Sequence, residues 1–410
     1  MKHFFFFRKM EKQKIYLDYN ATTPLSPKVI SAIQESLTND WGNPSSSHRY
    51  GTQAKDTITK ARKSIGEMIN RPSSEIIFTS GGTEANNMII FGVLQYFEEY
   101  KEYTKNWNIA KPHIITTNVE HDSVLLPILH LQKLSLIDFT LVEVNEKGCV
   151  DVDELLSKIT DSTCLITVMY SNNETGVIMP IAEIGKKLLQ INLERENQNL
   201  IKILFHTDAA QIIGKEKIDA QSLEIDYMTI VGHKFYGPRI GCVWSRAPLF
   251  PLLYGGGQEN NIRPGTENTP MIAGLGKAAE LVSLNVEKYQ KHMLACKEKL
   301  EMKLKEVFGN DIVINCYQSR RLSNTTNVSF VGEGLEGKTI LNNCEFLIAS
   351  VGAACHGSEC SKILVNSGVP VELAKNAIRL SVGRDTSFED IETVVLDLKQ
   401  AVSKIKNNLQ

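Results

Sequence analysis

The sequence lacks any apolar run that approaches the roughly 20 residues needed to span a bilayer, so no membrane partner is expected. Phe4 to Phe7 is too short for the core of a signal peptide, and no cleavage-like site follows it. The 410 residues carry a net charge of -2, which argues against a nucleic-acid-binding surface. Eight cysteines lie scattered without a pairing rhythm, which predicts reduced thiols and a cytosolic protein.

The small, polar run at residues 79–86 matches neither of two common nucleotide-binding motifs. It is neither a Gly-x-Gly-x-x-Gly fingerprint nor a P-loop, so neither a dinucleotide nor ATP is the favoured ligand there. A hydrophobic content of 42% and a charged content of 22% are those of an ordinary globular protein. The length is enough for a large core and two domains.

Apolar segments of strand length alternate with amphipathic helical segments over much of the chain. This order predicts crossover units and an α/β fold, with a mostly parallel seven-stranded sheet covered on both faces. A last strand at 240–245 is expected to be antiparallel. The other expected strands lie at 75–79, 113–117, 139–144, 164–170, 201–206 and 227–231.

A helical stripe runs from Asn268 to Gly309 and is too long for one compact domain. We therefore expect a large α/β domain over 15–267 and a smaller α+β domain over 268–410, which begins with this bridging helix. Residues 15–35 could pack on the smaller domain, and residues 1–14 are expected to be a disordered tip. No Gly/Ser-rich or Pro-rich linker separates the two parts.

Lys234 directly follows the expected strand at 227–231 and has no acidic neighbour. Desolvation lowers the pKa of a lysine, and a neutral amine can form a Schiff base with a carbonyl. A surface lysine is the alternative, since most lysines are exposed. Asp208 follows the preceding strand, and a carboxylate there, together with Lys234, is what pyridoxal phosphate (PLP) requires. Gln211, on the same loop, could reach the ring oxygen.

Other strand ends carry weaker signals. Residues 79–86 are small and polar and open a helix, which suits a phosphate but is also ordinary capping. His121 could stack on a flat cofactor or move protons, although a helix-start histidine is the plainer reading. Residues 171–176 form a polar cluster that is expensive to bury without partners.

Two further residues lie in the expected second domain. Cys355, beside His356 and among small residues, is a plausible thiolate nucleophile, with a buried inert cysteine as the alternative. Cys355 and Cys360 lack a second ligand pair, so no metal site is expected. Arg379 lies in an apolar strand-like stretch and needs an anionic partner, either a substrate carboxylate or a structural carboxylate.

Four long runs, at 17–24, 232–241, 263–282 and 350–356, give the chain a specific resemblance to a known family. From about Ile15 to the C-terminus it resembles the PLP enzymes of aminotransferase class V, within the cysteine desulfurase group. Inside that group it is most similar to the animal-type selenocysteine lyases. The resemblance implies the fold type I of PLP-dependent transferases and a homodimer with shared active sites.

Matched by motif, the resemblance implies functions for individual residues. Lys234 binds the cofactor covalently, His121 stacks on its ring, and Cys355 accepts the chalcogen. Arg379 binds the substrate carboxylate, and Asn173 contacts cofactor or substrate. The remaining expected cofactor contacts are Asp208, Gln211, Gly82, Thr83 and His233, with Thr266 reaching the phosphate of the other subunit.

The resemblance has two departures. Val231 stands where the general desulfurase pattern has a phosphate-binding serine, and the segment after Cys355 is shorter than in an animal lyase. Iron–sulfur desulfurases tend to carry a C-terminal tail that docks a scaffold protein, and the end of this sequence soon after its last expected helix makes that role less expected.

The expected reaction converts L-selenocysteine to L-alanine and reduced selenium, with an unidentified protein as a possible selenium acceptor. Three alternatives remain open. They are a cysteine desulfurase that supplies persulfide for iron–sulfur assembly or tRNA modification, a carrier that holds a chalcogen on Cys355, and an ordinary aminotransferase.

Overall fold

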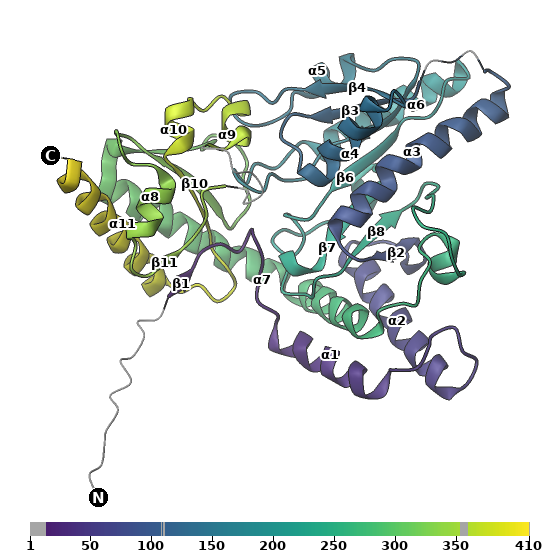
Figure 1. The fold of residues 1–410 in the computed structure, drawn as a ribbon, viewed down its shortest axis with the longest axis horizontal. Coiled ribbons are helices and arrows are strands. Elements are labelled where there is room, and N and C mark those ends of the chain that lie inside the picture. Colours follow the sequence, from purple (N-terminus) through teal and green to yellow (C-terminus); the bar gives the residue numbers. More distant parts are fainter. Residues whose placement is uncertain (1–13, 108, 110, 353–359, 410) are drawn as a thin grey trace, which may run out of the picture.

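The computed structural model describes residues 14–107, 109, 111–352 and 360–409. In this part of the chain, a seven-stranded sheet with the order β2-β8-β7-β6-β5-β3-β4 forms the centre (Figure 1). Strands β3 to β7 pair in parallel, and β8 pairs antiparallel with both β7 and β2. The predicted α/β fold with a mostly parallel sheet is confirmed. The strands are β2 (Ile76–Thr79), β3 (His113–Thr117), β4 (Asp138–Val142), β5 (Thr163–Thr167), β6 (Leu204–Asp208), β7 (Tyr227–Val231) and β8 (Gly241–Ser245).

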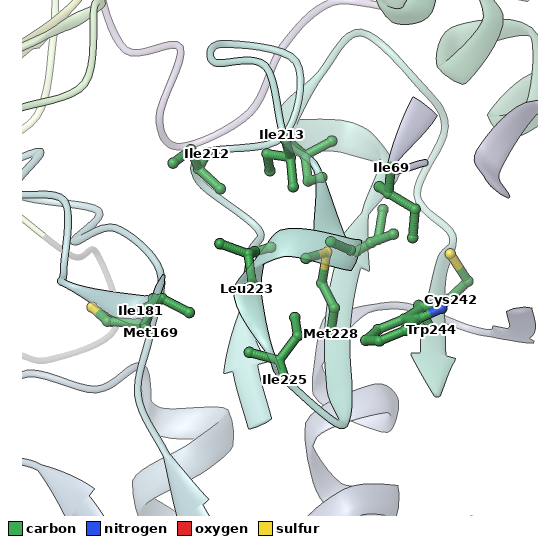
Figure 2. Close-up of a cluster of buried hydrophobic side chains, with 14 of the residues drawn as sticks. Ile69, Met169, Ile181, Ile212, Ile213, Leu223, Ile225, Met228, Cys242 and Trp244 are labelled. Atoms are coloured by element: carbon green, nitrogen blue, oxygen red, sulfur yellow. The ribbon is translucent and has the colours of Figure 1, made fainter. Parts of the chain in front are cut away.

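Helices cover both faces of the sheet because successive strand residues point to opposite sides. On β5, Leu165 belongs to the apolar cluster on the first face of the sheet, and Ile166 belongs to the apolar cluster on the second face. The first face is covered by α3 (Gly82–Thr104) and α4 (Asp122–Lys133), and the second by α2 (Arg49–Met68), α5 (Val152–Ser157) and α6 (Ile181–Asn197). Figure 2 shows part of the second cluster, where the fully buried side chain of Trp244 lies near Met228.

Strand β6 begins three residues later than the sequence predicts and ends two residues later. The apolar residues Ile201 and Ile203 are buried, but side chains of α6 bind their backbone. Asn192 exchanges two hydrogen bonds with Ile203, of 2.8 and 2.9 Å, and Arg195 Nε donates to the Ile201 carbonyl at 2.9 Å. The shift makes Asp208 the last residue of the strand, paired with Thr229 of β7, instead of a loop residue.

Helix α7 (Thr269–Phe308) is 40 residues long and contributes to two separate apolar clusters. Its first half packs Leu275 and Val282 into the cluster beneath the sheet, against α2 and α1 (Pro27–Asn39). Its second half packs Leu300 and Leu304 into another cluster, which also contains residues of the C-terminal part. The predicted long helix is therefore present and spans both cores.

The C-terminal part contains an antiparallel sheet in the order β12-β10-β9, and β1 pairs with β11. Leu17 packs into the same core, so the segment near β1 contacts this part of the molecule. The division into domains at residue 268 stays a prediction, and residues 1–13 lie outside the described residues. The elements are β1 (Ile15–Tyr16), β9 (Ile312–Ile314), β10 (Thr325–Phe330), α8 (Gly337–Asn343), β11 (Leu347–Ile348), α9 (Lys362–Asn366), α10 (Val371–Lys375), β12 (Ala377–Ser381) and α11 (Phe388–Leu409).

The two helices α9 and α10 are not anticipated by the sequence reading. Each has five residues, which is too short for a helical period to be visible in the sequence. Among the described residues, no helix combines the length and the apolar character that crossing a membrane requires.

The close approach of α7 to α2 depends on Gly276, which gives the first testable prediction. A Cβ at Gly276 would lie 2.4 Å from Cα of Ala61, so backbone must move, whereas one at Gly274 would meet side chains, Ile33 at 2.7 Å and Pro238 at 3.2 Å. Both changes gain about 1 kcal/mol of helix propensity. We expect Gly276→Ala to lower the free energy of unfolding by roughly 1–3 kcal/mol and Gly274→Ala to lower it less. Urea unfolding at one protein concentration measures both, and equal midpoints would contradict this packing.

Candidate active site

Lys234 lies in a single 3-10 turn, Gly232–Lys234, that directly follows β7. The side chain is half-buried, and its Nζ donates to the backbone carbonyls of Asn20 and Ala21, at 2.8 and 2.9 Å. After the turn, Tyr236 adopts a φ of 67°, a conformation that is unfavourable for a bulky residue. Its N–H donates to Thr23 Oγ1 at 2.7 Å, which anchors the turn to the N-terminal segment. The lysine is therefore held by backbone dipoles at the carboxyl end of β7.

Asp208 ends β6, next to the end of β7, and the residue is 8% exposed. Asn86 Nδ2 donates to Asp208 Oδ2 at 2.8 Å and lies at the same distance from Ser123 Oγ. Asn86 is fully buried, and its own oxygen accepts from Thr229 Oγ1 at 2.7 Å. These bonds fix the carboxylate while its second oxygen accepts from the N–H of Ala210. The sequence run 79–86 contains Asn86, but nothing in the sequence indicates that it orients Asp208.

His121 is the N-cap residue of α4, and its ring remains exposed. The N–H of Ser123 donates to Nδ1 at 3.1 Å, so Nδ1 is the unprotonated nitrogen and Nε2 carries the hydrogen in the neutral ring. Ser123 is also bonded to Asn86, which is bonded to Asp208. The structure thus connects the predicted stacking histidine to the predicted ring-nitrogen partner.

Gln211 has a partner that the sequence analysis did not identify, the buried Lys215. Lys215 Nζ donates to the main-chain carbonyl of Gln211 at 2.6 Å and to its Oε1 at 3.0 Å. Gln211 Nε2 donates to the Asn20 carbonyl at 3.0 Å, the same carbonyl that accepts from Lys234. These two partners fix the orientation of the Gln211 amide, because its oxygen accepts from Lys215 and its nitrogen donates to Asn20. A lysine in a turn gives no sequence signal for burial.

Several positive charges gather around this centre. Burial lowers the pKa of Lys215 well below its usual value, and the nearby Lys234, Arg379 and Arg384 lower it further. Burial likewise lowers the pKa of His233 to about 4, helped by Lys234. His233 Nδ1 lies 3.0 Å from Thr22 Oγ1, so this ring is neutral and hydrogen-bonded at neutral pH. Such a centre favours ligands that carry phosphate or carboxylate groups.

The predicted phosphate contacts Gly82 and Thr83 form the first turn of α3, where backbone N–H groups are free to bind an anion. Gly82 is half-buried and Thr83 is exposed, and no atom lies within 4 Å of the place where a Cβ on Gly81 would stand. A Cβ on Gly82 would lie 2.6 Å from Cγ2 of Val231. The valine that replaces the family's serine therefore packs against this turn and requires glycine there.

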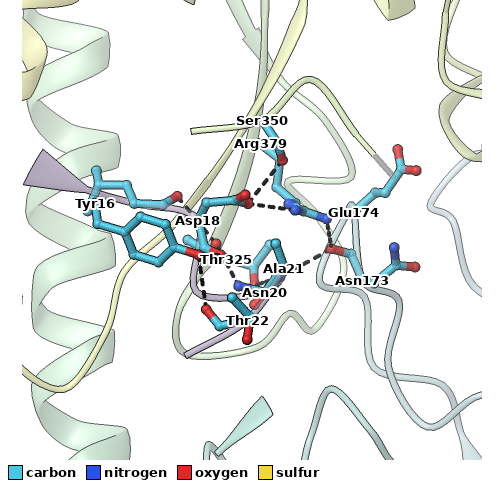
Figure 3. A network of polar contacts seen from close by, with 12 residues as sticks. Tyr16, Asp18, Asn20, Ala21, Thr22, Asn173, Glu174, Thr325, Ser350 and Arg379 are labelled. Atoms are coloured by element: carbon cyan, nitrogen blue, oxygen red, sulfur yellow. Dashed lines mark hydrogen bonds and ion pairs between the residues drawn. The ribbon is translucent and has the colours of Figure 1, made fainter. Parts of the chain in front are cut away.

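Arg379 lies on β12 with its guanidinium at the same centre (Figure 3). Its side chain is 4% exposed and donates through NH2 to Asp18 Oδ1 at 2.6 Å. NH1 donates to the carbonyl of Asn173 at 3.0 Å. Arg379 thus has a structural carboxylate partner and also contacts Asn173, one of the other predicted site residues.

Two predicted residues are not brought to this centre by the described contacts. Thr266 is exposed on the segment before α7. Arg263 anchors this segment to the first turn of α3, where its Nε donates to Glu84 Oε1 at 2.8 Å. Cys355 lies outside the described residues. Close to that segment in sequence, Ser361 Oγ donates to the buried Glu174 at 2.5 Å.

The described residues fit PLP, for three reasons on different sides of the centre. The open turn at Gly81 and Gly82 presents N–H groups where a phosphate could bind. The oriented carboxylate of Asp208 is of the kind that pairs with a pyridine N–H. Lys234 Nζ is bonded to neutral carbonyls, which can release a lysine that reacts with an aldehyde.

Glu120, next to His121, is a buried carboxyl to which the sequence assigns no function. Its Oε1 accepts from Thr117 Oγ1 at 2.7 Å and from the N–H of Met169 at 2.9 Å. Burial raises its pKa to about 8, and the charge of Asp208 contributes in the same direction. The group is thus protonated in the folded protein near neutral pH.

Glu120→Gln tests this assignment through the pH dependence of stability. From the usual pKa of 4.5 up to about 8, the folded state holds a proton that the unfolded state releases, so the free energy of unfolding falls as pH rises. Glutamine does not titrate, so the free energy of unfolding of Glu120→Gln should not fall in this way. The difference between variant and wild type should therefore shift in favour of the variant, by a few kcal/mol in total, as pH rises through that window. Urea unfolding at several pH values measures the difference, with the exposed Glu102→Gln as control. A difference that stays constant with pH would refute the buried, protonated carboxyl.

Comparison with known proteins identifies the family of this chain. Residues 15–394 match the family described as aminotransferase class-V. A selenocysteine lyase from Xenopus laevis is 50% identical, with 97% of this chain and 96% of that protein covered. A cysteine desulfurase IscS from Dictyoglomus turgidum is 38% identical, with 96% of each covered. The solved structure of a NifS-like protein superposes with a TM-score of 0.84 at 30% identity, covering 96% of this chain and 100% of that one. This chain belongs to the class-V aminotransferase family.

Proposed function

We propose that the protein is a PLP-dependent selenocysteine lyase, which converts L-selenocysteine to L-alanine and reduced selenium. The observation that carries the proposal is the convergence of Lys234, Gln211 and Asn173 on the Asn20 turn, with Arg379 bonded to the Asn173 carbonyl. This network contains an amine, an amide and a guanidinium, the three kinds of group that the proposed reaction needs. The 50% identity to a named selenocysteine lyase supports the choice of substrate.

PLP bound at this centre would supply an electron-accepting ring for the bond changes at the amino acid's Cα. Asp208 would hold the proton on the pyridine nitrogen, fixed in place by Asn86. Gln211 would donate to the ring oxygen, and His121 would cover the ring face. Gly82, Thr83 and His233 would hold the phosphate, with Thr266 of a second copy completing the site in a homodimer.

The protein's own groups would carry out the proton transfers. Lys234, once free of the cofactor, would take the proton from Cα of the amino acid. Arg379 would bind the carboxylate of the same amino acid, with Asn173 beside it. His121 is the candidate for delivering a proton to the product, since its ring is exposed at the centre.

Cys355 is proposed as the residue that captures selenium. Its thiolate would attack the selenium atom, so that a sulfur–selenium bond forms while the Cβ–selenium bond breaks. The electron pair of the broken bond stays on Cβ, which takes up a proton as alanine is formed. A thiol reductant would then reduce the sulfur–selenium bond, releasing selenide and regenerating Cys355, while the reductant becomes a disulfide.

A cysteine desulfurase is the second candidate, because an IscS desulfurase is 38% identical and a NifS-like structure superposes over 96% of the chain. The same groups would act on L-cysteine and leave a persulfide on Cys355. A cytosolic location and a selenium-accepting protein are parts of the first proposal.

The two candidates predict different substrate preferences. A thiol with a pKa of about 8.5 is only about 3% ionised at pH 7, whereas a selenol is largely ionised, so a site that requires the anion prefers selenocysteine by roughly thirtyfold. Alanine formation from each amino acid, measured side by side with PLP and reductant, is the test. A preference of that order supports the lyase, and comparable rates would assign the chain to the desulfurases instead.

Cys355→Ala tests the chalcogen-accepting residue. We expect turnover of selenocysteine to fall by about a hundredfold, the scale on which a group that acts in the transition state is lost. Cys344→Ala is the matched control, because the Cys344 thiol is half-buried and burial raises its pKa to about 12. Full turnover of both amino acids by Cys355→Ala would rule out the proposed capture step.

A further inference from the structure

Arg379 already holds a carboxylate of its own chain. Its NH2 lies 2.6 Å from Asp18 Oδ1, and the two side chains are 4% and 16% exposed (Figure 3). An arginine that binds a carboxylate through two N–H groups needs both on one edge of the guanidinium. Here NH1 donates a hydrogen bond to the Asn173 carbonyl, and NH2 donates one to Asp18.

The Nε nitrogen of this guanidinium is left over. Nε of Arg379 is buried and has no hydrogen-bond partner among the described residues. A buried donor without a partner costs free energy unless a ligand satisfies it. The edge formed by Nε and NH2 could therefore hold a carboxylate with two bonds, but Asp18 occupies half of that edge.

Asp18 itself is fixed by more than Arg379. Ser350 Oγ donates to the same Oδ1 at 3.0 Å, and the Ser350 carbonyl accepts from the backbone N–H of Arg379 at 2.7 Å. Asp18 thus has a second hydrogen-bond donor that could keep its oxygen satisfied if Arg379 turned to another carboxylate. The arrangement allows an exchange of partners without leaving Asp18 unbonded.

The surrounding charges decide the direction of the effect. Lys234, Arg379 and Arg384 all lie close enough to Lys215 to interact with it electrostatically. Asp18 is the carboxylate in direct contact with Arg379, so it lowers the positive potential that an incoming carboxylate meets. Asp18 opposes the binding of a carboxylate to Arg379 whether it stays in place or moves when the amino acid binds.

We propose that Asp18 competes with the carboxylate of the amino acid for Arg379 and thereby sets the affinity of the site for substrate and product. The inference rests on the proposed function, in which Arg379 binds the amino acid's carboxylate. Substrate and alanine carry the same carboxylate, so the competition weakens both. Asp18 is in this sense an affinity-determining residue that also promotes product release.

Asp18→Asn in the PLP-loaded protein tests the proposal. The amide oxygen can still accept from Ser350, but the negative charge is gone. We expect the KM for the amino acid and the dissociation constant for L-alanine, measured by calorimetry, both to fall by roughly tenfold. If Asp18 only orients Arg379, both constants rise instead, which would overturn the proposal, as would unchanged values.

Glu301→Gln is the matched control. Glu301 pairs with Arg321 at 2.8 Å, with side chains 10% and 5% exposed, so this change also removes a buried carboxylate from an arginine. It should lower stability without changing either constant. A fall in KM with Glu301→Gln as well would mean that the effect is not specific to Arg379, and would overturn the proposal.

The wild-type protein provides a second test if Asp18→Asn does not fold. Because Asp18 offsets the attraction of Arg379, replacing L-alanine by L-alaninamide should weaken binding by less than about tenfold. A loss of a hundredfold or more would contradict the competition. A wild-type protein that turns over neither amino acid would remove the proposed function and this inference together, whereas an active one with a raised KM in Asp18→Asn removes only the inference.

Discussion

The buried Asn20 turn is the constraint on which the rest of the site depends. Its carbonyl accepts from both Lys234 and Gln211, and its side chain donates to Thr325 Oγ1 and to the Asn173 carbonyl. These partners come from the ends of β6 and β7, from the loop after β5, and from β10. One residue that is 1% exposed therefore fixes the relative positions of four segments far apart in the sequence. Moving this turn would change the direction of the Lys234 amine and of the Gln211 amide at once.

A second constraint is the concentration of positive charge around that turn. Lys234, Arg379 and Arg384 lie near Lys215, and burial lowers the pKa of Lys215 well below its usual value and the pKa of His233 to about 4. The centre is thereby prepared for anionic groups, while the His233 ring stays neutral at neutral pH. The phosphate of PLP and the carboxylate of an amino acid are the ligands that such a site favours. Asp18 moderates this attraction at Arg379.

Much of this arrangement follows from the sequence because it depends on local patterns. The strand Tyr227–Val231 is an apolar run with β-forming residues, and its end predicts the place of Lys234. Likewise Asp208 is predicted at a neighbouring strand end, where ligands bind in sheets of this kind. The seven-stranded sheet follows from the alternation of strands and helices.

What the sequence did not predict depends on contacts between distant residues. Lys215 is buried only because Gln211 and the surrounding loops enclose it, and lysines are usually exposed. Asn86 and Asp18 acquire their partners through packing across more than a hundred residues of sequence. The late start of β6 depends on side chains of α6, which no strand pattern reveals. The contacts of Cys355 and the crossing of Thr266 into a second copy stay predictions.

The most direct test of the account is to identify the lysine that binds PLP. The protein is incubated with PLP, reduced with borohydride so that the linkage becomes permanent, and digested for mass spectrometry. We predict the modification on Lys234, whose amine is half-buried and held by two backbone carbonyls. The buried Lys215 is the informative alternative, since burial lowers its pKa well below the usual value. Modification of Lys215 in place of Lys234, or of neither lysine, would contradict the account.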